Sequence, residues 1–306
     1  MRRLLIKTTL LILVPVIVVS FFMLLMSDNG SKYSHEVNVA LAYQRLDSLR
    51  GQKKIVIIAG SNGGFSINSQ ILHDSLKLPV VNTSTNAGFG VRMQFEIYKG
   101  LLEKGDIVVF CPEYYSDKKR LYGESTLFRI LSTHMPKAYL KMNLRQWYNT
   151  FKYIGIHCQK SIEHIGNHPF EGAYSEKSVN SFGDISFPRD HHEIKDEYHF
   201  KGNMDDETTA YYQYIHEYSK EKGINLIYLP PTLIESNYIS QKPQIDSLVT
   251  FMQANNIPFR AAPKRYVFND SLFFDTPYHM TTQGAIIRTQ NLVEDIKSII
   301  QENQQK

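Results

Sequence analysis

The chain has 306 residues, of which 42% are apolar, so it can bury one large core or two small ones. Its formal net charge of +4 includes three basic residues within the first seven positions, which leaves the remainder close to neutral. No basic stripe of the kind that binds nucleic acid is visible in the sequence. We therefore expect no nucleic-acid partner.

The amino terminus has the pattern of a membrane anchor. The basic residues precede a run from Thr8 to Met26 without any charge, which is about the length that a membrane-spanning helix needs. The positive-inside rule then places residues 1–7 in the cytoplasm and the chain after Asp28 outside.

A cleaved signal peptide begins with a similar pattern. Residues 20–26 offer no small-x-small cleavage site, and no cysteine follows closely that could carry a lipid, so we favour an uncleaved anchor. We expect a single-pass protein of a bacterial inner membrane. Its parts would be a cytoplasmic stub and anchor (1–27), a linker helix (28–53) and an extracytoplasmic α/β domain (54–306).

Strand-like and helix-like stretches alternate along much of this domain. The predicted strands cover residues 54–60, 78–81, 107–111, 224–229 and 257–261. The predicted helices cover residues 66–76, 91–103, 206–222, 243–255 and 282–300. This alternation is typical of a doubly wound, flavodoxin-like sheet, and we expect five parallel strands with helices on both faces.

The alternation is interrupted once, by residues 114–205. This stretch is rich in Tyr, Phe, His, Asn and Lys, and its clearest helical pattern runs from Leu140 to Tyr153. It is too long for a loop, so we interpret it as an insertion or small cap. Two alternatives stay open: it shapes a substrate cleft at the carboxyl edge of the sheet, or it is a peripheral decoration.

The candidate nucleophile is Ser61, which follows the apolar run Ile55–Ile58 at the end of a predicted central strand. Ligands bind at this edge in open α/β sheets. A serine nucleophile needs a base that accepts its proton and a group that orients the base. Asp275 and His279 supply both within five residues, after the last strand. On spacing alone, the alternative is that these three residues are ordinary polar residues of turns and loops.

The arrangement resembles the SGNH (GDSL-like) hydrolase superfamily, with a serine after the first strand, a glycine-bearing loop after the second, and an acid and a histidine before the final helix. The phrases Lys104–Val109 and Phe274–Gly284 are similar to membrane-tethered bacterial members, such as alginate O-acetylation proteins and the protein of teichoic-acid D-alanylation. The resemblance covers residues 54–113 and 206–300.

The resemblance implies a triad of Ser61 as nucleophile, His279 as base and Asp275 as the orienting acid. The chain departs from the family pattern at the acid, because the usual Asp-x-x-His has two intervening residues and this chain has three.

The resemblance also implies donors for an oxyanion. They would be the N–H of Ser61, the N–H of Gly88 or Gly90, and Asn86 as a nearby amide. The family places a further asparagine after the third strand, where this chain has Glu113. Losing one such donor typically costs roughly 3 kcal/mol of transition-state stabilisation.

The sequence predicts no cofactor and no metal. It contains no phosphate-binding loop of the P-loop or dinucleotide type, and its histidines lack the spacing of a compact ligand set. The histidines considered as ligands are His157, His164, His168, His191 and His192.

We therefore expect a membrane-anchored serine esterase or O-acyltransferase that acts on an envelope polysaccharide or acylated glycan. As a transferase it would need a membrane-bound acyl carrier protein or O-acyltransferase as a partner. The alternative is a non-catalytic envelope protein of the same fold that binds a glycan or a membrane partner.

Overall fold

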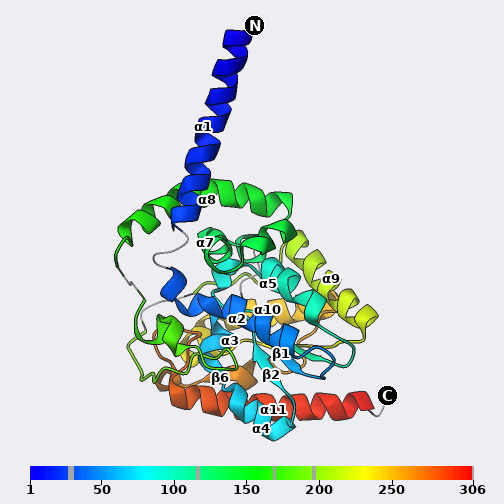
Figure 1. Cartoon of the computed structure of the whole chain (residues 1–306). Coiled ribbons are helices and arrows are strands. Elements are labelled where there is room, and N and C mark those ends of the chain that lie inside the picture. Colours follow the sequence, from blue (N-terminus) through cyan, green and yellow to red (C-terminus); the bar gives the residue numbers. More distant parts are fainter. Residues whose placement is uncertain (27–30, 115–117, 168–169, 195–197, 305–306) are drawn as a thin grey trace.

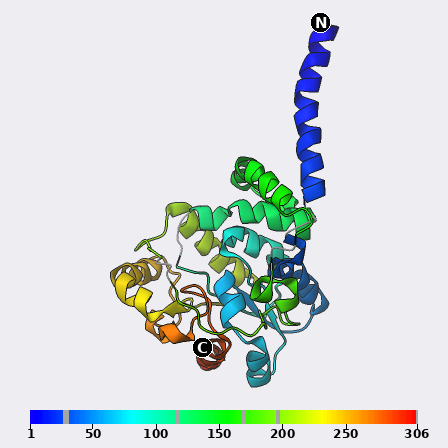
Figure 2. The same ribbon diagram turned by 90° about the vertical axis from the view of Figure 1, so that its left-hand side faces the viewer.

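A computed structural model describes residues 1–26, 31–114, 118–167, 170–194 and 198–304. The helix α1 (Arg2–Met26) extends away from a mixed α/β body in both views (Figures 1 and 2). Its stretch from Arg2 to Ser20 is wholly unburied and is long and apolar enough to cross a membrane. The predicted apolar helix is therefore present.

The body is built around a parallel sheet in which, among the described residues, four strands pair in the order β2-β1-β3-β4. The central strands are β1 (Ile55–Ile58) and β3 (Ile107–Phe110), and the outer ones are β2 (Val80–Asn82) and β4 (Asn225–Tyr228). Every residue of β1 and β3 is buried, as a central parallel strand covered on both faces requires.

Helices cover both faces of this sheet. Because side chains alternate along a strand, Val56 and Val108 point to one face while Ile57 and Val109 point to the other. The first face packs on α2 (Asn38–Ser48), α5 (Val91–Tyr98) and α9 (Asp206–Lys222). The second face packs on α4 (Ser69–Leu76) and α11 (Thr282–Gln304). The segment predicted as a linker thus supplies α2 to the packing of the body.

The expected fifth strand is not part of the sheet. Residues 257–261 contain no strand, although Arg260 N donates to Tyr228 O at the end of β4 (2.8 Å). Pro258 has no N–H to donate to a strand ladder, which explains why the pairing stops at one bond. Two further short strands, β5 (Leu233–Ile234) and β6 (Val267–Phe268), pair in parallel and form a separate sheet.

Several helix boundaries also differ from the prediction, among them the end of α5 at Tyr98 rather than Glu103. The helix expected at 66–76 begins only at Ser69, as α4, because Ile67 and Asn68 take extended conformations and Asn68 caps α4; Ser66 instead ends a separate short helix, α3 (Ser61–Ser66). Pro243 predicts a helix start, since proline is favoured in a first turn, but α10 (Glu235–Ala254) begins earlier and contains Pro243.

The insertion contains three α-helices among its described residues: α6 (Lys118–Tyr122), α7 (Ser125–His134) and α8 (Leu144–Glu163). They lie on the side of the body from which α1 extends, whereas α4 and α11 lie on the opposite side (Figures 1 and 2). The rest of the insertion is irregular and approaches the carboxyl edge of the sheet, as the contacts of the candidate site show.

Candidate functional site

Ser61 lies where the sequence predicts it, at the carboxyl end of a central strand. It is the first residue of α3, it is partly exposed, and only Ala59 and Gly60 separate it from β1. A Cβ atom at Gly60 would lie 2.0 Å from Glu113 Oε2, so a larger residue there would force the Glu113 side chain or the connection to move. Because Ser61 follows β1 and Glu113 follows β3, both stand where the strand order reverses.

Asp275 and His279 form an acid–base pair. His279 Nδ1 lies 2.9 Å from Asp275 Oδ1, and the Tyr174 hydroxyl donates to Asp275 Oδ2 over 2.6 Å. The same hydroxyl oxygen lies 3.2 Å from His279 Nδ1. Since the single Tyr174 proton is directed to the carboxylate, Nδ1 of a neutral His279 is the protonated nitrogen and Nε2 is the acceptor.

The electrostatics of the pair agree with these roles. Burial acts to raise the pKa of Asp275. The hydrogen bond and the charge of His279, and then the hydrogen bond of Tyr174, act in the opposite direction and together leave this pKa below its ordinary value. Burial, and next the charge of Asp275, raise the pKa of Tyr174. At neutral pH Asp275 is therefore a carboxylate that accepts two hydrogen bonds, and Tyr174 is a neutral donor.

A tight turn accommodates the three-residue spacing between the acid and the histidine. Thr276 Oγ1 accepts hydrogen bonds from the N–H groups of Tyr278 (3.3 Å) and His279 (3.1 Å). Phe274 N donates to His279 O over 2.7 Å and closes the loop at its base. The spacing that departs from the family pattern therefore still lets the acid contact the imidazole.

Helix α3 contacts His279 through Phe65. The Phe65 ring stacks on the His279 ring, with centroids 4.1 Å apart and planes within 10° of each other. Ser61 and Phe65 are four residues apart in α3 and so share one face of it. No hydrogen bond joins Ser61 Oγ to any of the described residues. Catalytic hydrogen bonds are often long without substrate, so the nucleophile–base contact stays a prediction.

The insertion contributes side chains to this candidate site. Tyr174 belongs to it, and so does the buried Arg189. Arg189 donates to Phe65 O (2.9 Å) and to Met280 O (3.0 Å), and its guanidinium lies 5.5 Å from the Phe65 ring centroid. Arg189 thus joins the end of α3 to the residue after His279.

The segment before α2 also reaches the site. His35 Nδ1 lies 3.2 Å from Tyr174 O, and its ring packs edge-on against the rings of Phe65 and Tyr174. Burial lowers the pKa of His35, so the imidazole is neutral at neutral pH. The sequence pattern does not predict that Tyr174, Arg189 and His35 lie at this site, because no spacing relates them to Asp275 and His279.

A network of buried hydrogen bonds holds the first turn of α3 in place. Arg288 of α11 donates to the backbone oxygen of Asn62 (3.0 Å) and to its Oδ1 (3.2 Å), and Asn62 Nδ2 donates to Cys111 O (3.0 Å). Glu113 Oε1 accepts from Asn62 N (3.1 Å). Asn62 and Arg288 are almost fully buried, so these contacts hold the residue that follows Ser61 in one orientation.

Two of the predicted oxyanion donors already have other hydrogen-bond partners. Gly88 N donates to Asn86 Oδ1 (2.9 Å), and Gly90 N donates to Ala87 O (3.2 Å), so both N–H groups are used within their own turn. Glu113 stands close to Ser61, as its place after the third strand predicts, but it accepts a hydrogen bond there. The N–H of Ser61 begins a helix and has no intrahelical partner.

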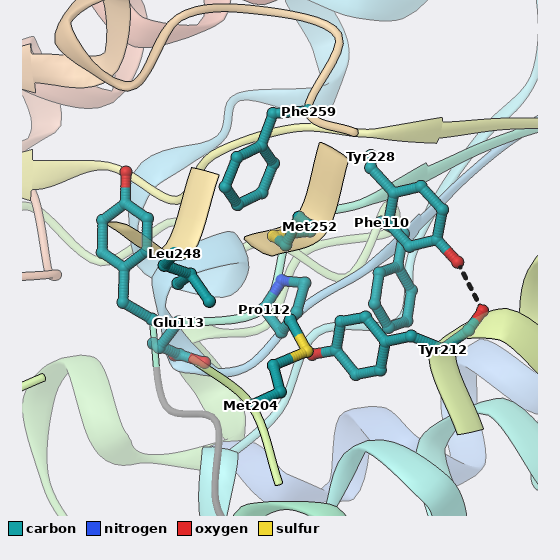
Figure 3. A pocket seen from close by; sticks show the side chains of 10 residues that line it. Phe110, Pro112, Glu113, Met204, Tyr212, Tyr228, Leu248, Met252 and Phe259 are labelled. Carbon is teal, nitrogen blue, oxygen red and sulfur yellow. Dashed lines mark hydrogen bonds between the residues drawn. The ribbon is translucent and has the colours of Figure 1, made fainter. Parts of the chain in front are cut away.

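A small apolar cavity of about 20 Å³ lies beside Glu113 (Figure 3). Phe110 and Tyr228 line it from the sheet, and Tyr212, Leu248 and Met252 line it from the helices α9 and α10. The Tyr228 hydroxyl donates to Tyr212 O over 2.8 Å at its edge. Glu113 thus separates this cavity from the Gly60–Ser61 connection.

The described residues contain no group of three or more His, Cys, Asp or Glu side chains arranged to hold a metal, and His168 lies outside the described residues. Cys111 and Cys158 are both free thiols, and Cys111 is buried.

Comparison of the chain with models of protein families, with curated proteins and with solved structures found no match.

Proposed function

We propose that the protein is a membrane-anchored serine esterase or O-acyltransferase of the SGNH type, acting on an envelope polysaccharide or acylated glycan. One observation carries the proposal: His279 Nδ1 contacts Asp275, and the His279 ring stacks on Phe65, which lies one helical turn after Ser61 in α3. The strand order β2-β1-β3-β4 is that of the first four strands of a flavodoxin-like sheet and agrees with such a fold.

In the proposed reaction Ser61 Oγ attacks the acyl carbonyl carbon while His279 Nε2 accepts the hydroxyl proton. Collapse of the tetrahedral intermediate breaks the ester bond, and His279 returns the proton to the leaving alkoxide. Water or a sugar hydroxyl then attacks the acyl-enzyme, with His279 again accepting and returning a proton. Asp275, held by Tyr174, stabilises the imidazolium that forms in each half-reaction.

The same proposal includes the location. Helix α1 would span a bacterial inner membrane as an uncleaved anchor, with residues 1–7 in the cytoplasm and the α/β body outside. A transferase in this place would receive acyl groups from a membrane-bound acyl carrier protein or O-acyltransferase.

A second function is favoured by the oxyanion region. Because the N–H groups of Gly88 and Gly90 are bonded within their turn and Glu113 replaces an amide donor, a tetrahedral oxyanion would find few donors near Ser61. The alternative is a non-catalytic protein of this fold that binds a glycan or a membrane partner.

The test is labelling of the full chain in detergent with a fluorophosphonate, followed by peptide mass spectrometry. Labelling at Ser61 in the wild type that is lost in Ser61→Ala and strongly reduced in His279→Gln would support the enzyme. Ser48→Ala, at an exposed serine of α2, is the matched control and should label normally. A folded wild type that takes no label would reject catalysis, and glycan binding would then be measured on the same protein.

A further inference from the structure

Helix α8 carries its polar residues on the buried side and its apolar residues on the exposed side. Its buried side chains are Gln146, Thr150, His157 and Ser161. On the opposite side, Leu144, Tyr148, Phe151 and Ile162 are between 54% and 88% exposed. These four fall on one stripe, since their spacings of four, three and eleven residues are close to whole helical turns. A surface helix of a globular protein has the reverse arrangement.

The apolar stripe continues beyond both ends of α8. Leu140 precedes the helix and is 91% exposed, and Ile165 follows it and is 63% exposed. Monomeric soluble proteins rarely expose contiguous apolar surface of this extent, so something of low polarity is expected to cover it.

The short connection to α1 places this stripe close to a membrane. Four residues separate Met26 at the end of α1 from Ser31, so the two Cα atoms are at most about 18 Å apart. Ser31 O is bonded by His134 of α7 (2.9 Å), and Ser31 lines a pocket together with His157 and Ser161 of α8. Helix α1 also contacts α8, and it ends beside α8 in both views (Figures 1 and 2).

The charged residues around the apolar stripe are mostly basic, which favours contact with anionic lipid headgroups. Residues 136–165 contain five Lys or Arg residues, all exposed, against Glu163 as the one acidic residue. The basic residues are Lys137, Lys141, Arg145, Lys152 and Lys160. Apolar and aromatic residues flanked by basic ones are typical of helices that lie in a membrane interface.

We propose that α8 lies flat on the membrane in which α1 is anchored. Leu144, Tyr148, Phe151 and Ile162 enter the boundary between headgroups and acyl chains, and the basic residues contact anionic phospholipids. The inference rests on the anchoring by α1 that is part of the proposed function, but not on catalysis. It gives the body two attachments to the bilayer, so that the candidate site is held at a defined tilt to the membrane surface.

Trp147 provides the probe, because it is the one tryptophan of the chain and belongs to α8. The full chain is reconstituted in vesicles of phosphatidylcholine and phosphatidylglycerol whose acyl chains carry bromine near the headgroup end. Trp147 is half-buried and lies on α8 next to the apolar stripe, so we expect these lipids to quench its fluorescence relative to unbrominated vesicles.

The variant Leu144→Ser/Phe151→Ser/Ile162→Ser replaces three of the four residues of the apolar stripe without touching the buried side of α8, and it should lose most of the quenching. Its control is Ile239→Ser, at an equally exposed apolar residue of α10, which should be quenched like the wild type. Circular dichroism establishes that each variant is folded.

Flotation of the vesicles separates the two inferences. A wild type that floats but is not quenched overturns the docking of α8, and so does equal quenching of the wild type and the triple variant. A wild type that fails to float overturns the anchor itself, which is a failure of the proposed location.

Discussion

The Tyr174 hydroxyl donates a 2.6 Å hydrogen bond to Asp275 Oδ2 across 101 residues of sequence. This bond occupies one carboxylate oxygen while His279 occupies the other at 2.9 Å. The insertion therefore reaches the acid of the candidate triad and fixes the carboxylate plane in which the imidazole is held.

Tyr174→Phe should keep the packing of the ring and lose this hydrogen bond. The hydrogen bond helps to lower the pKa of Asp275, so its loss should raise that pKa and weaken the orientation of His279. We expect the rate of fluorophosphonate labelling to fall by about tenfold, which corresponds to roughly 1.4 kcal/mol. An unchanged rate would contradict a positioning role. Tyr214→Phe, at an exposed tyrosine of α9, is the control.

Asp275→Asn should affect the reaction far more than the fold. An amide in this position no longer fixes the protonated nitrogen of the imidazole, and such a change in a serine triad lowers the rate by roughly 10⁴-fold. The rate of labelling at Ser61 measures the effect. A loss of less than tenfold would show that Asp275 is not the acid of a triad.

The same substitution should give a pH-dependent loss of stability. Because the pKa of Asp275 is lower in the folded protein than in the unfolded chain, its ionised form stabilises the fold above the unfolded pKa. This stabilisation is lost as the pH falls below about 4 and through the folded pKa. Urea unfolding of the wild type and Asp275→Asn should therefore differ at pH 7 and converge on acidification. A difference that is constant with pH would refute this coupling.

Gly60→Ala should disturb the connection between β1 and α3. The new methyl group would lie 2.0 Å from Glu113 Oε2, so either Glu113 or the start of α3 has to move. We expect a loss of about 1 to 3 kcal/mol in the free energy of unfolding, together with slower labelling of Ser61. Gly100→Ala is the matched control, because a Cβ there meets nothing within 4 Å. Equal stability of the two variants would contradict the close packing of Glu113.

Arg288→Leu should destabilise the network of buried hydrogen bonds at the first turn of α3. It leaves two buried acceptors of Asn62 without their donor, and each unsatisfied group costs about 1 to 3 kcal/mol. Thermal and urea unfolding measure the loss. Arg265→Leu, at a partly exposed arginine that pairs with Glu294 and Asp295, should cost less. The reverse order of the two losses would show that Arg288 is not the main support of Asn62.

The local sequence was sufficient to predict the features that depend only on residues close together in the chain. The apolar run Ile55–Ile58 followed by Gly60 predicts a buried strand and a serine at its end, and both are present. Asp275 and His279 are close enough in sequence that a turn alone can join them, so their contact was predictable.

Interactions between distant segments decided the rest. Tyr174 and Arg189 of the insertion and His35 near the anchor meet at His279 and Phe65 only because the sheet brings their segments to one edge. The absence of a fifth strand depends on whether residues 257–261 can pair with β4, which Pro258 limits. Which side of α8 is buried likewise depends on its neighbours. Sequence patterns report local conformation, whereas these contacts depend on where the packed sheet places residues that are far apart in the chain.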